Sequence, residues 1–296
     1  MDRIKIVETP RDAMQGIKPF IPTEKKAEYI QSLLQVGFDI VDFGSFVSSK
    51  AIPQLKDTAE VLEKLDLSGT NTKLLAIVGN LRGARRGAGF GKISYLGYPH
   101  SVSDHFLMLN LSSSLEKSRK VTADILNTCA STNTGLVVYL SMAFGNPYSE
   151  DWSVDILMEE CRKLQTMGVR YIALSDTVGA SYPASIAAVF MALVPEFPDI
   201  EFSFHLHTTL EQWYEKIDAA CSHGCRTFDG VINGLGGCPM AGHKLVGNIQ
   251  TGRILEYIEK NELETKIDKQ AFENALAKSI TTFVDIDMEN GENFLK

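Results

Sequence analysis

The strongest constraint on the fold is a regular alternation of short apolar runs with amphipathic stretches of helix length, from residue 4 to about residue 262. Strands that alternate with helices predict a parallel sheet, and eight such units predict a closed (β/α)₈ TIM barrel. An open doubly wound sheet would carry a glycine-rich phosphate loop after its first strand. Thr9-Pro10-Arg11-Asp12 follows the first run instead, so the barrel is favoured.

The eight strands are expected at 4–8, 38–42, 73–78, 92–96, 136–142, 170–174, 200–206 and 227–231. The clearest helices are expected at 22–35, 52–65, 113–130, 151–167, 183–194 and 245–259, with Thr23 and Ser113 as N-caps. The basic stretch 82–87 is expected to be a glycine-broken turn. A further helix is expected at 270–282. We therefore predict a catalytic barrel over 1–262 and a C-terminal helical extension over 263–296 that packs on it.

Composition narrows the function classes. The net charge of −8 and the absence of an extended basic run, beyond the short stretch 82–87, argue against a nucleic-acid partner. No apolar run reaches membrane-spanning length, which argues against a membrane protein. The five cysteines are scattered and odd in number, as in proteins of a reducing compartment. Because the first residues also lack an apolar or Arg/Ser-rich targeting segment, a cytoplasmic location is expected.

A His-x-His pair ends the seventh apolar run. Residues two apart in a strand share a face, so His205 and His207 should point the same way, with Cβ atoms roughly 6 to 7 Å apart. A single histidine is more often an ordinary packing or surface residue, but two at this spacing form half of a metal site. The other four histidines have no such partner, and we expect them on the surface or in loops: His100, His105, His223 and His243.

Other polar residues also follow the expected strands. In a TIM barrel the carboxyl ends of the strands carry the chemistry. The ends of strands are exposed to water and are often polar for that reason alone. Exposure to water explains less well a set that contains several acids, an arginine and a cysteine. These residues are Glu8, Arg11, Asp12, Gln15, Asp42, Ser45, Asn80, Ser141, Asn146, Ser175, Asp176, Asn233, Cys238 and Asn248.

Four segments resemble the 3-hydroxy-3-methylglutaryl-CoA lyases, a family of metal-dependent TIM-barrel enzymes. They are residues 7–15 (VETPRDAMQ), 45–50 (SFVSSK), 205–207 (HLH) and 234–239 (GLGGCP). The Arg-Asp and His-x-His elements mark the wider superfamily of carbon–carbon lyases and synthases, whereas the segments 45–50 and 234–239 point to the lyase branch. The resemblance implies cleavage of an acyl-CoA thioester to acetyl-CoA and acetoacetate, in a protein expected to be a homodimer.

The resemblance also implies roles for individual residues. The divalent cation would be held by Asp12, His205, His207 and Asn248. The catalytic residues would be Arg11, Asp42, Asp176, His205 and Cys238. Substrate contacts fall to Arg11, Gln15, Lys18, Ser45 and Asn80, and a basic lip for the coenzyme A tail could include Lys18, Lys50 and Arg82.

The chemistry of these residue types agrees with such a site. Two imidazoles, a carboxylate and an amide oxygen suit Mg²⁺ or Mn²⁺, with positions left for substrate oxygens. A bound cation would lower the pKa of a substrate hydroxyl. Arg11 would stabilise the enolate, and Cys238 could protonate carbon. The base that removes the hydroxyl proton stays open between Asp42, Asp176 and His205.

Three positions depart from the family pattern. Asp42 replaces a glutamate, Ala13 replaces a glycine, and Thr208 replaces an aspartate. These changes concern the substrate pocket more than the metal ligands. Two alternatives to the lyase therefore remain: a related Claisen or aldol enzyme acting on a 2-oxo or hydroxy acid, and a non-catalytic barrel that keeps the metal site.

Overall fold

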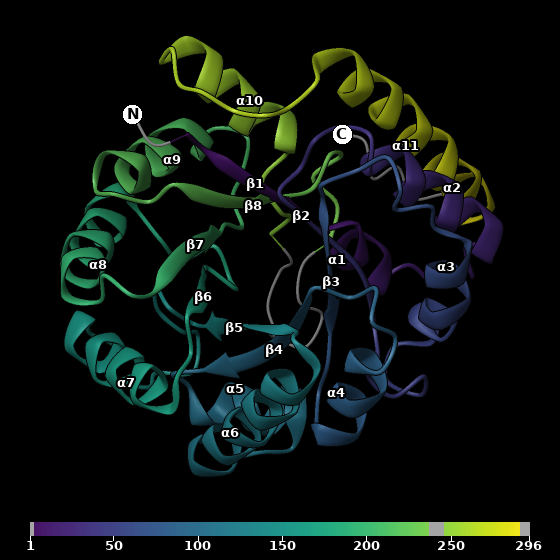
Figure 1. Cartoon of the computed structure of the whole chain (residues 1–296). Coiled ribbons are helices and arrows are strands. Elements are labelled where there is room, and N and C mark those ends of the chain that lie inside the picture. Colours follow the sequence, from purple (N-terminus) through teal and green to yellow (C-terminus); the bar gives the residue numbers. More distant parts are fainter. Residues whose placement is uncertain (1–2, 237–245, 291–296) are drawn as a thin grey trace.

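The computed structural model describes residues 3–236 and 246–290, with side chains up to residue 283. Eight parallel strands close a barrel in sequence order, with β8 paired to β1, as predicted (Figure 1). The strands are β1 (Lys5–Glu8), β2 (Ile40–Ser45), β3 (Lys73–Ile77), β4 (Tyr95–Ser101), β5 (Gly135–Ser141), β6 (Tyr171–Ser175), β7 (Glu201–His205) and β8 (Thr227–Gly230). The fold is thus a (β/α)₈ TIM barrel.

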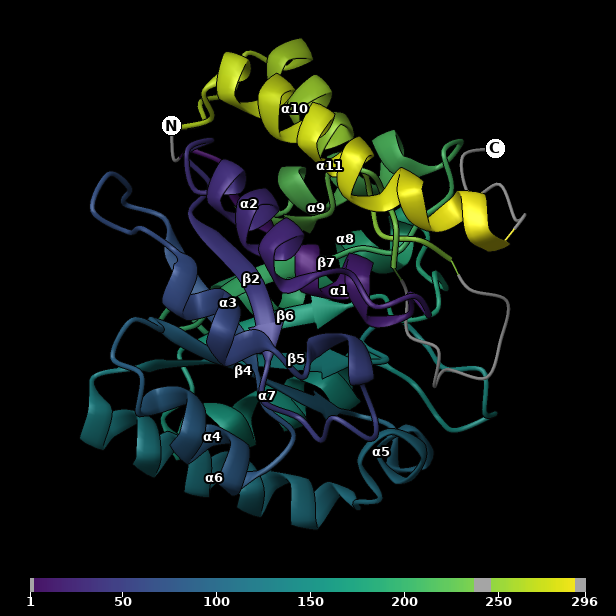
Figure 2. The same ribbon diagram turned by 90° about the vertical axis from the view of Figure 1, so that its right-hand side faces the viewer.

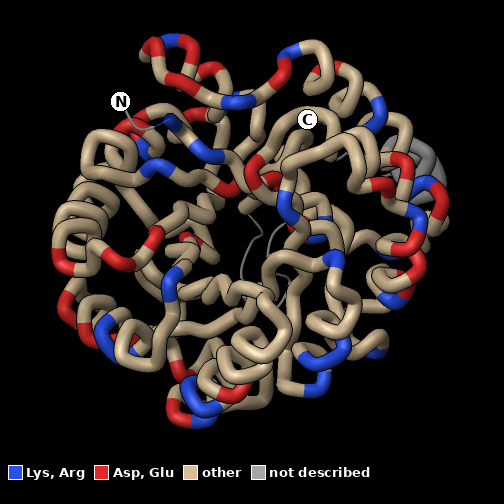
Figure 3. Tube along the Cα trace, in the orientation of Figure 1, with Lys and Arg blue, Asp and Glu red and all other residues tan. Residues whose placement is uncertain are grey.

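Helices surround the barrel. They are α1 (Pro10–Gln15), α2 (Thr23–Leu33), α3 (Thr58–Lys64), α4 (Leu81–Ala88), α5 (Asp104–Leu111), α6 (Leu115–Thr132), α7 (Val154–Met167), α8 (Pro183–Glu196), α9 (Trp213–Ser222), α10 (Thr251–Lys260) and α11 (Lys269–Asn290), with a 3₁₀ turn at Pro53–Leu55. Most charged residues lie on these helices and the loops (Figure 3). No helix within the described ranges is long and apolar enough to cross a membrane.

The C-terminal helix α11 packs along α2 (Figure 2). The ring of Phe283 meets Tyr29 edge-on, with centroids 5.7 Å apart, and Lys278 pairs with Glu28. The expected C-terminal helix is therefore present. The domain division at residue 262 stays a prediction.

The barrel interior is filled by alternate residues of neighbouring strands. Leu75, Ile77, Val137, Tyr139 and Ala173 form one buried cluster, whereas the residues between them face the helices and join the larger core. Interior space is tight near β4: a Cβ on Gly97 would lie 2.5 Å from Ile77 Cδ1 and 3.0 Å from the Tyr139 ring. Glycine at this position lets Tyr139 fill the barrel.

The stretch 82–87, expected as a turn, is part of helix α4. Asn80 caps it by accepting a hydrogen bond from Gly83 N at 2.9 Å. A Cβ on Gly83 would lie 2.8 Å from the Phe46 carbonyl oxygen, and one on Gly87 would lie 2.9 Å from Leu96. The glycines that suggested a break are instead the places where the helix approaches its neighbours closely.

Two predicted caps are also wrong. Helix α2 has Pro22 at its N-cap, and the Thr23 hydroxyl donates instead to Asp57 at 2.8 Å. Helix α6 is capped by Ser114, whose hydroxyl accepts from Lys117 N at 3.3 Å, and not by Ser113. Helix α5 was not expected. Strand β4 begins and ends later than expected. Gly97 and Pro99 interrupt the apolar pattern from which its position was predicted.

His100 was expected at the surface and is fully buried. Its Nε2 lies 2.8 Å from Glu160 Oε1, and its Nδ1 lies 2.7 Å from Ser118 Oγ. Arg119 also pairs with Glu160. The prediction failed because β4 turns His100 toward α6 and α7, where a carboxylate and a hydroxyl satisfy both ring nitrogens. His105 is exposed and His223 half-buried, while His243 lies outside the described residues.

Candidate active site

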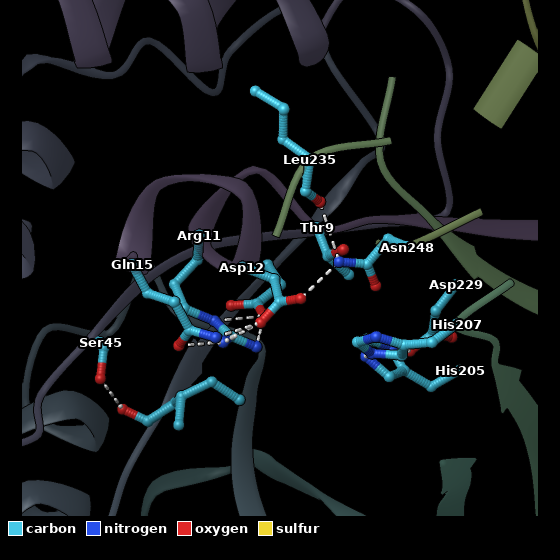
Figure 4. Close-up of polar contacts among 12 residues, drawn as sticks. Thr9, Arg11, Asp12, Gln15, Ser45, His205, His207, Asp229, Leu235 and Asn248 are labelled. Atoms are coloured by element: carbon cyan, nitrogen blue, oxygen red, sulfur yellow. Dashed lines mark hydrogen bonds and ion pairs between the residues drawn. The ribbon is translucent and has the colours of Figure 1, made fainter. Parts of the chain in front are cut away.

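Three groups able to bind a metal converge at the carboxyl end of the barrel. Asp12 lies on α1, directly after β1, while His205 ends β7 and His207 follows it. One ligand atom from each lies within 4.8 Å of those of the other two, and all three residues are buried. Figure 4 shows the two imidazole rings on one side and the Asp12 carboxylate on the other, with Asn248 close to both.

The two imidazoles are held by their Nδ1 atoms. Nδ1 of His205 lies 3.2 Å from Asp229 Oδ2, and Nδ1 of His207 lies 2.8 Å from the Val246 carbonyl oxygen. The Nε2 atoms therefore face each other, 3.3 Å apart. Partners on the far nitrogen fix the tautomer and orientation of metal-binding histidines. Two converging Nε2 atoms are the arrangement that a shared cation requires.

The electrostatics keep one imidazole neutral. Burial and the neighbouring His205 lower the pKa of His207 to about 4. Burial also disfavours charge on His205, but the hydrogen bond to Asp229 and the negative charges of Asp229 and Asp12 together outweigh it and raise the pKa of His205. For Asp12, burial favours the neutral acid, yet Arg11 and the histidines outweigh it and lower the pKa of that carboxyl. An ionised carboxylate and a neutral imidazole are the forms that coordinate cations.

Asn248 completes the cluster. An isolated bridge between Asn248 and His207 brings the two segments together. Its Nδ2 donates to Asp12 Oδ2 at 2.5 Å and to the Leu235 carbonyl oxygen at 3.0 Å. Its Oδ1 is buried and accepts no hydrogen bond from the described residues. An unsatisfied buried acceptor is costly, so the residues present fit a cation that this oxygen could help to bind.

Arg11 lies beside the predicted metal ligands, held in a network of buried groups. Its Nε and Nη2 donate to Asp42 Oδ2 at 2.9 and 2.6 Å, and its Nη1 donates to Asp12 Oδ1 at 2.9 Å and Gln15 Oε1 at 3.0 Å. Burial raises the pKa of Asp42 to about 6, against the opposing effect of Arg11. Asp42 Oδ1 accepts no hydrogen bond within the described chain. The network fixes the guanidinium next to the cluster.

Glu8 anchors the segment that carries Asn248. Its carboxylate is fully buried, accepting from Ile232 N at 2.8 Å and from Thr251 Oγ1 at 2.5 Å. Ile232 precedes the stretch that includes Leu235 and Asn248, and Thr251 follows it. One side chain at the end of β1 therefore holds both ends of this segment. Burial raises the pKa of Glu8 to about 8, although both hydrogen bonds lower it.

The structure thus brings seven of the predicted residues together: Arg11, Asp12, Gln15, Asp42, His205, His207 and Asn248. The Asp176 carboxylate is engaged elsewhere, accepting from Ser181 Oγ at 2.5 Å and pairing with Lys216 at 3.7 Å.

The remaining predicted residues lie outside this network. Ser45 donates to the Ile77 carbonyl oxygen at 3.1 Å, Asn80 caps α4, and Lys18 is exposed. The two other basic candidates, Lys50 and Arg82, are also exposed. Cys238 lies outside the described residues.

Sequence reasoning missed two residues of the site. Asp229 pairs in register with His205 on neighbouring strands; a carboxylate inside a buried strand was the available signal. The Tyr139 ring meets His205 edge-on, with centroids 5.6 Å apart at 90°. Its hydroxyl makes no hydrogen bond to another described residue. Nothing in the apolar run 136–142 distinguished this tyrosine from a packing residue.

Two imidazoles, a carboxylate and an amide thus converge at the carboxyl end of the strands of a (β/α)₈ barrel. This is the end at which TIM-barrel enzymes carry out their chemistry, so the fold and the site indicate a TIM-barrel enzyme. The HMGL-like family model matches residues 3–278. The chain belongs to the HMGL-like family, and it is a lyase.

The relatives agree with this assignment. The chain is 31% identical over 268 residues to the cytoplasmic 3-hydroxy-3-methylglutaryl-CoA lyase of Rattus norvegicus, covering 90% of this chain and 77% of that protein. It is 31% identical over 258 residues to the hydroxymethylglutaryl-CoA lyase of Bacillus subtilis, covering 87% of this chain and 85% of the relative.

Solved structures are similar over nearly the whole chain. An HMG-CoA lyase from Acinetobacter baumannii, in complex with coenzyme A and 3-methylmalate, superposes with a TM-score of 0.88 at 25% identity, covering 99% of this chain and 97% of that one. The Bacillus subtilis HMG-CoA lyase superposes with a TM-score of 0.87 at 29% identity, covering 100% and 96%.

Proposed function

We propose that this protein is a divalent-metal-dependent lyase that cleaves 3-hydroxy-3-methylglutaryl-CoA, or a close analogue, to acetyl-CoA and acetoacetate. The convergence of Asp12, His205 and His207 carries the proposal, together with the unsatisfied buried oxygen of Asn248. Mg²⁺ and Mn²⁺ are the proposed cations because the ligand set mixes oxygen with imidazole and offers no thiolate.

When bound, the cation would polarise the hydroxyl and carbonyl oxygens of the substrate. Asp42 is the proposed base, because its Oδ1 has no hydrogen-bond partner among the described residues, whereas Asp176 is engaged by Ser181 and Lys216. Loss of the hydroxyl proton lets the oxygen electrons form a ketone, and the adjacent carbon–carbon bond breaks toward the thioester.

Arg11 is proposed to stabilise the resulting enolate. Its guanidinium is fixed by Asp42, Asp12 and Gln15, so it needs little reorganisation as negative charge develops on the thioester oxygen. Protonation of the enolate carbon then yields acetyl-CoA. Cys238 stays the proposed acid for this step on the strength of the family resemblance.

Incubation of the purified protein with the thioester and Mg²⁺ or Mn²⁺, with acetoacetate as the readout, tests the proposal. We expect activity that is lost with a chelator, restored by the cation, and lost in His207→Ala and Cys238→Ala. His105→Ala, at an exposed histidine, is the matched control. Absence of acetoacetate above the Cys238→Ala background would reject the lyase. Release of free coenzyme A from acetyl-CoA and a 2-oxo acid would identify a synthase instead.

A homodimer and a cytoplasmic location are part of the same proposal. The relatives include proteins named as cytoplasmic and as mitochondrial, so location needs its own measurement. Size-exclusion chromatography with light scattering would test the dimer, and a mass of one chain, 32.7 kDa, would contradict it.

A further inference from the structure

A cavity lies at the opposite end of the barrel from the candidate active site. Its lining includes the first residues of several strands, among them Lys5 of β1, Lys73 of β3, Tyr95 of β4 and Glu201 of β7. Its volume is about 690 Å³, within the range of small-molecule sites. We call it the amino-end cavity. Asp12, His205 and His207 lie at or just after the carboxyl ends of β1 and β7, so the strands separate the two sites.

The cavity has an excess of positive charge. Four basic residues line it, Arg3, Lys5, Lys73 and Lys266, against two acidic residues, Asp39 and Glu201. Four positive and two negative charges leave a local balance of +2, in a chain whose net charge is −8. A concave surface whose charge is opposite to that of the whole protein concentrates anions.

Two of the basic residues already have partners. Arg3 Nη1 donates to Asp39 Oδ2 at 3.0 Å, and Lys5 Nζ lies 2.9 and 2.8 Å from the two Glu201 oxygens. The ammonium groups that remain are those of two exposed lysines, Lys73 at the start of β3 and Lys266 in the segment before α11. Neither forms an ion pair with a described residue. The positive excess therefore resides on groups that can turn toward a ligand.

Between the charged groups the lining is partly apolar. Tyr95 and Tyr171 meet edge to face, with centroids 5.3 Å apart and planes at 77°, and both are half-buried. Phe38 and Ile40 add apolar surface. Half-buried aromatic edges offer contact to a small carbon skeleton, while the lysines offer two positive charges to its ends.

We propose that the amino-end cavity binds a small organic dianion, with Lys73 and Lys266 neutralising its negative charges and the two tyrosines contacting its carbon skeleton. A free inorganic anion would use the lysines alone. An organic dianion uses the aromatic surface as well, so it should bind more tightly than phosphate. This site does not depend on the proposed lyase activity, because it shares no residue with the metal cluster.

Titration calorimetry at low ionic strength with phenyl phosphate, succinate and inorganic phosphate tests the site. We expect saturable binding of phenyl phosphate or succinate, more tightly than phosphate. The double variant Lys73→Ala/Lys266→Ala should raise the dissociation constant by about tenfold or more. The control Lys117→Ala/Lys120→Ala removes the same charge from exposed positions on α6 and should leave binding unchanged.

Three results would overturn the proposal. The first is no saturable binding of either organic dianion by the unaltered protein. The second is equal weakening by the two double variants, which would indicate a diffuse charge effect. The third is binding that the Lys73→Ala/Lys266→Ala variant retains, which would place the anion elsewhere, for instance beside Arg11. The substitution Tyr171→Ala should weaken the binding of phenyl phosphate more than that of inorganic phosphate, because only phenyl phosphate contacts the aromatic surface.

Discussion

The fully buried Glu8 should make the stability of this protein fall as the pH rises. Its pKa is raised from 4.5 to about 8, chiefly by burial. Between these two values the unfolded chain has lost the Glu8 proton while the folded chain still holds it. Folding therefore takes up a proton in this window, and the free energy of unfolding decreases with increasing pH. Below the window, and again above it, Glu8 makes no pH-dependent contribution.

The size of the effect follows from the width of the window. One proton changes the free energy of unfolding by at most about 1.4 kcal/mol per pH unit, so from about pH 5 to about pH 8 Glu8 can remove up to about 4 kcal/mol. Glu8→Gln keeps the shape of the side chain and one acceptor for Ile232 N, and its amide can donate to Thr251 Oγ1. We expect this variant to match the unaltered protein near about pH 5 and to be more stable near about pH 8.

Urea unfolding at several pH values measures the difference. At each pH the free energy of unfolding of Glu8→Gln is compared with that of the unaltered protein, so that the contributions of the other titrating groups cancel. Glu60→Gln, at an exposed position on α3, controls for the loss of one negative charge. If the free energies of unfolding of Glu8→Gln and the unaltered protein changed in parallel with pH, Glu8 would have the same pKa in the folded and unfolded states. That result would refute the reasoning.

Three further outcomes are expected. Asp229→Asn should weaken Mn²⁺ binding about 10- to 100-fold by electron paramagnetic resonance, because His205 loses the carboxylate that orients it; an unchanged affinity would contradict this. Lys26→Met should destabilise the protein by about 3 kcal/mol or more in urea, because it leaves the buried Asp57 carboxylate without its cation at 2.8 Å. Tyr139→Phe should lower kcat/KM about tenfold and leave Mn²⁺ affinity intact, because its hydroxyl has no hydrogen-bond partner among the described residues; parallel losses of both would indicate a structural role.

The sequence by itself determined the barrel and part of the site. The alternation of apolar runs with helical stretches leaves few ways to bury every apolar face, and eight repeats close a barrel. The period of a strand predicts that His205 and His207 share a face, and they converge although β7 ends at His205. Both facts are local, so a single sequence was enough to predict them.

The tertiary structure decided the features that depend on distant neighbours. Asp229 orients His205 only because β7 and β8 pair in one register, and His100 is buried only because α6 and α7 cover β4 and present Ser118 and Glu160. The same holds for the glycines of α4, which suggested a turn but fit a helix that packs closely on Phe46. Each depends on which surfaces meet across the barrel, and contacts between residues far apart in the chain leave no local pattern.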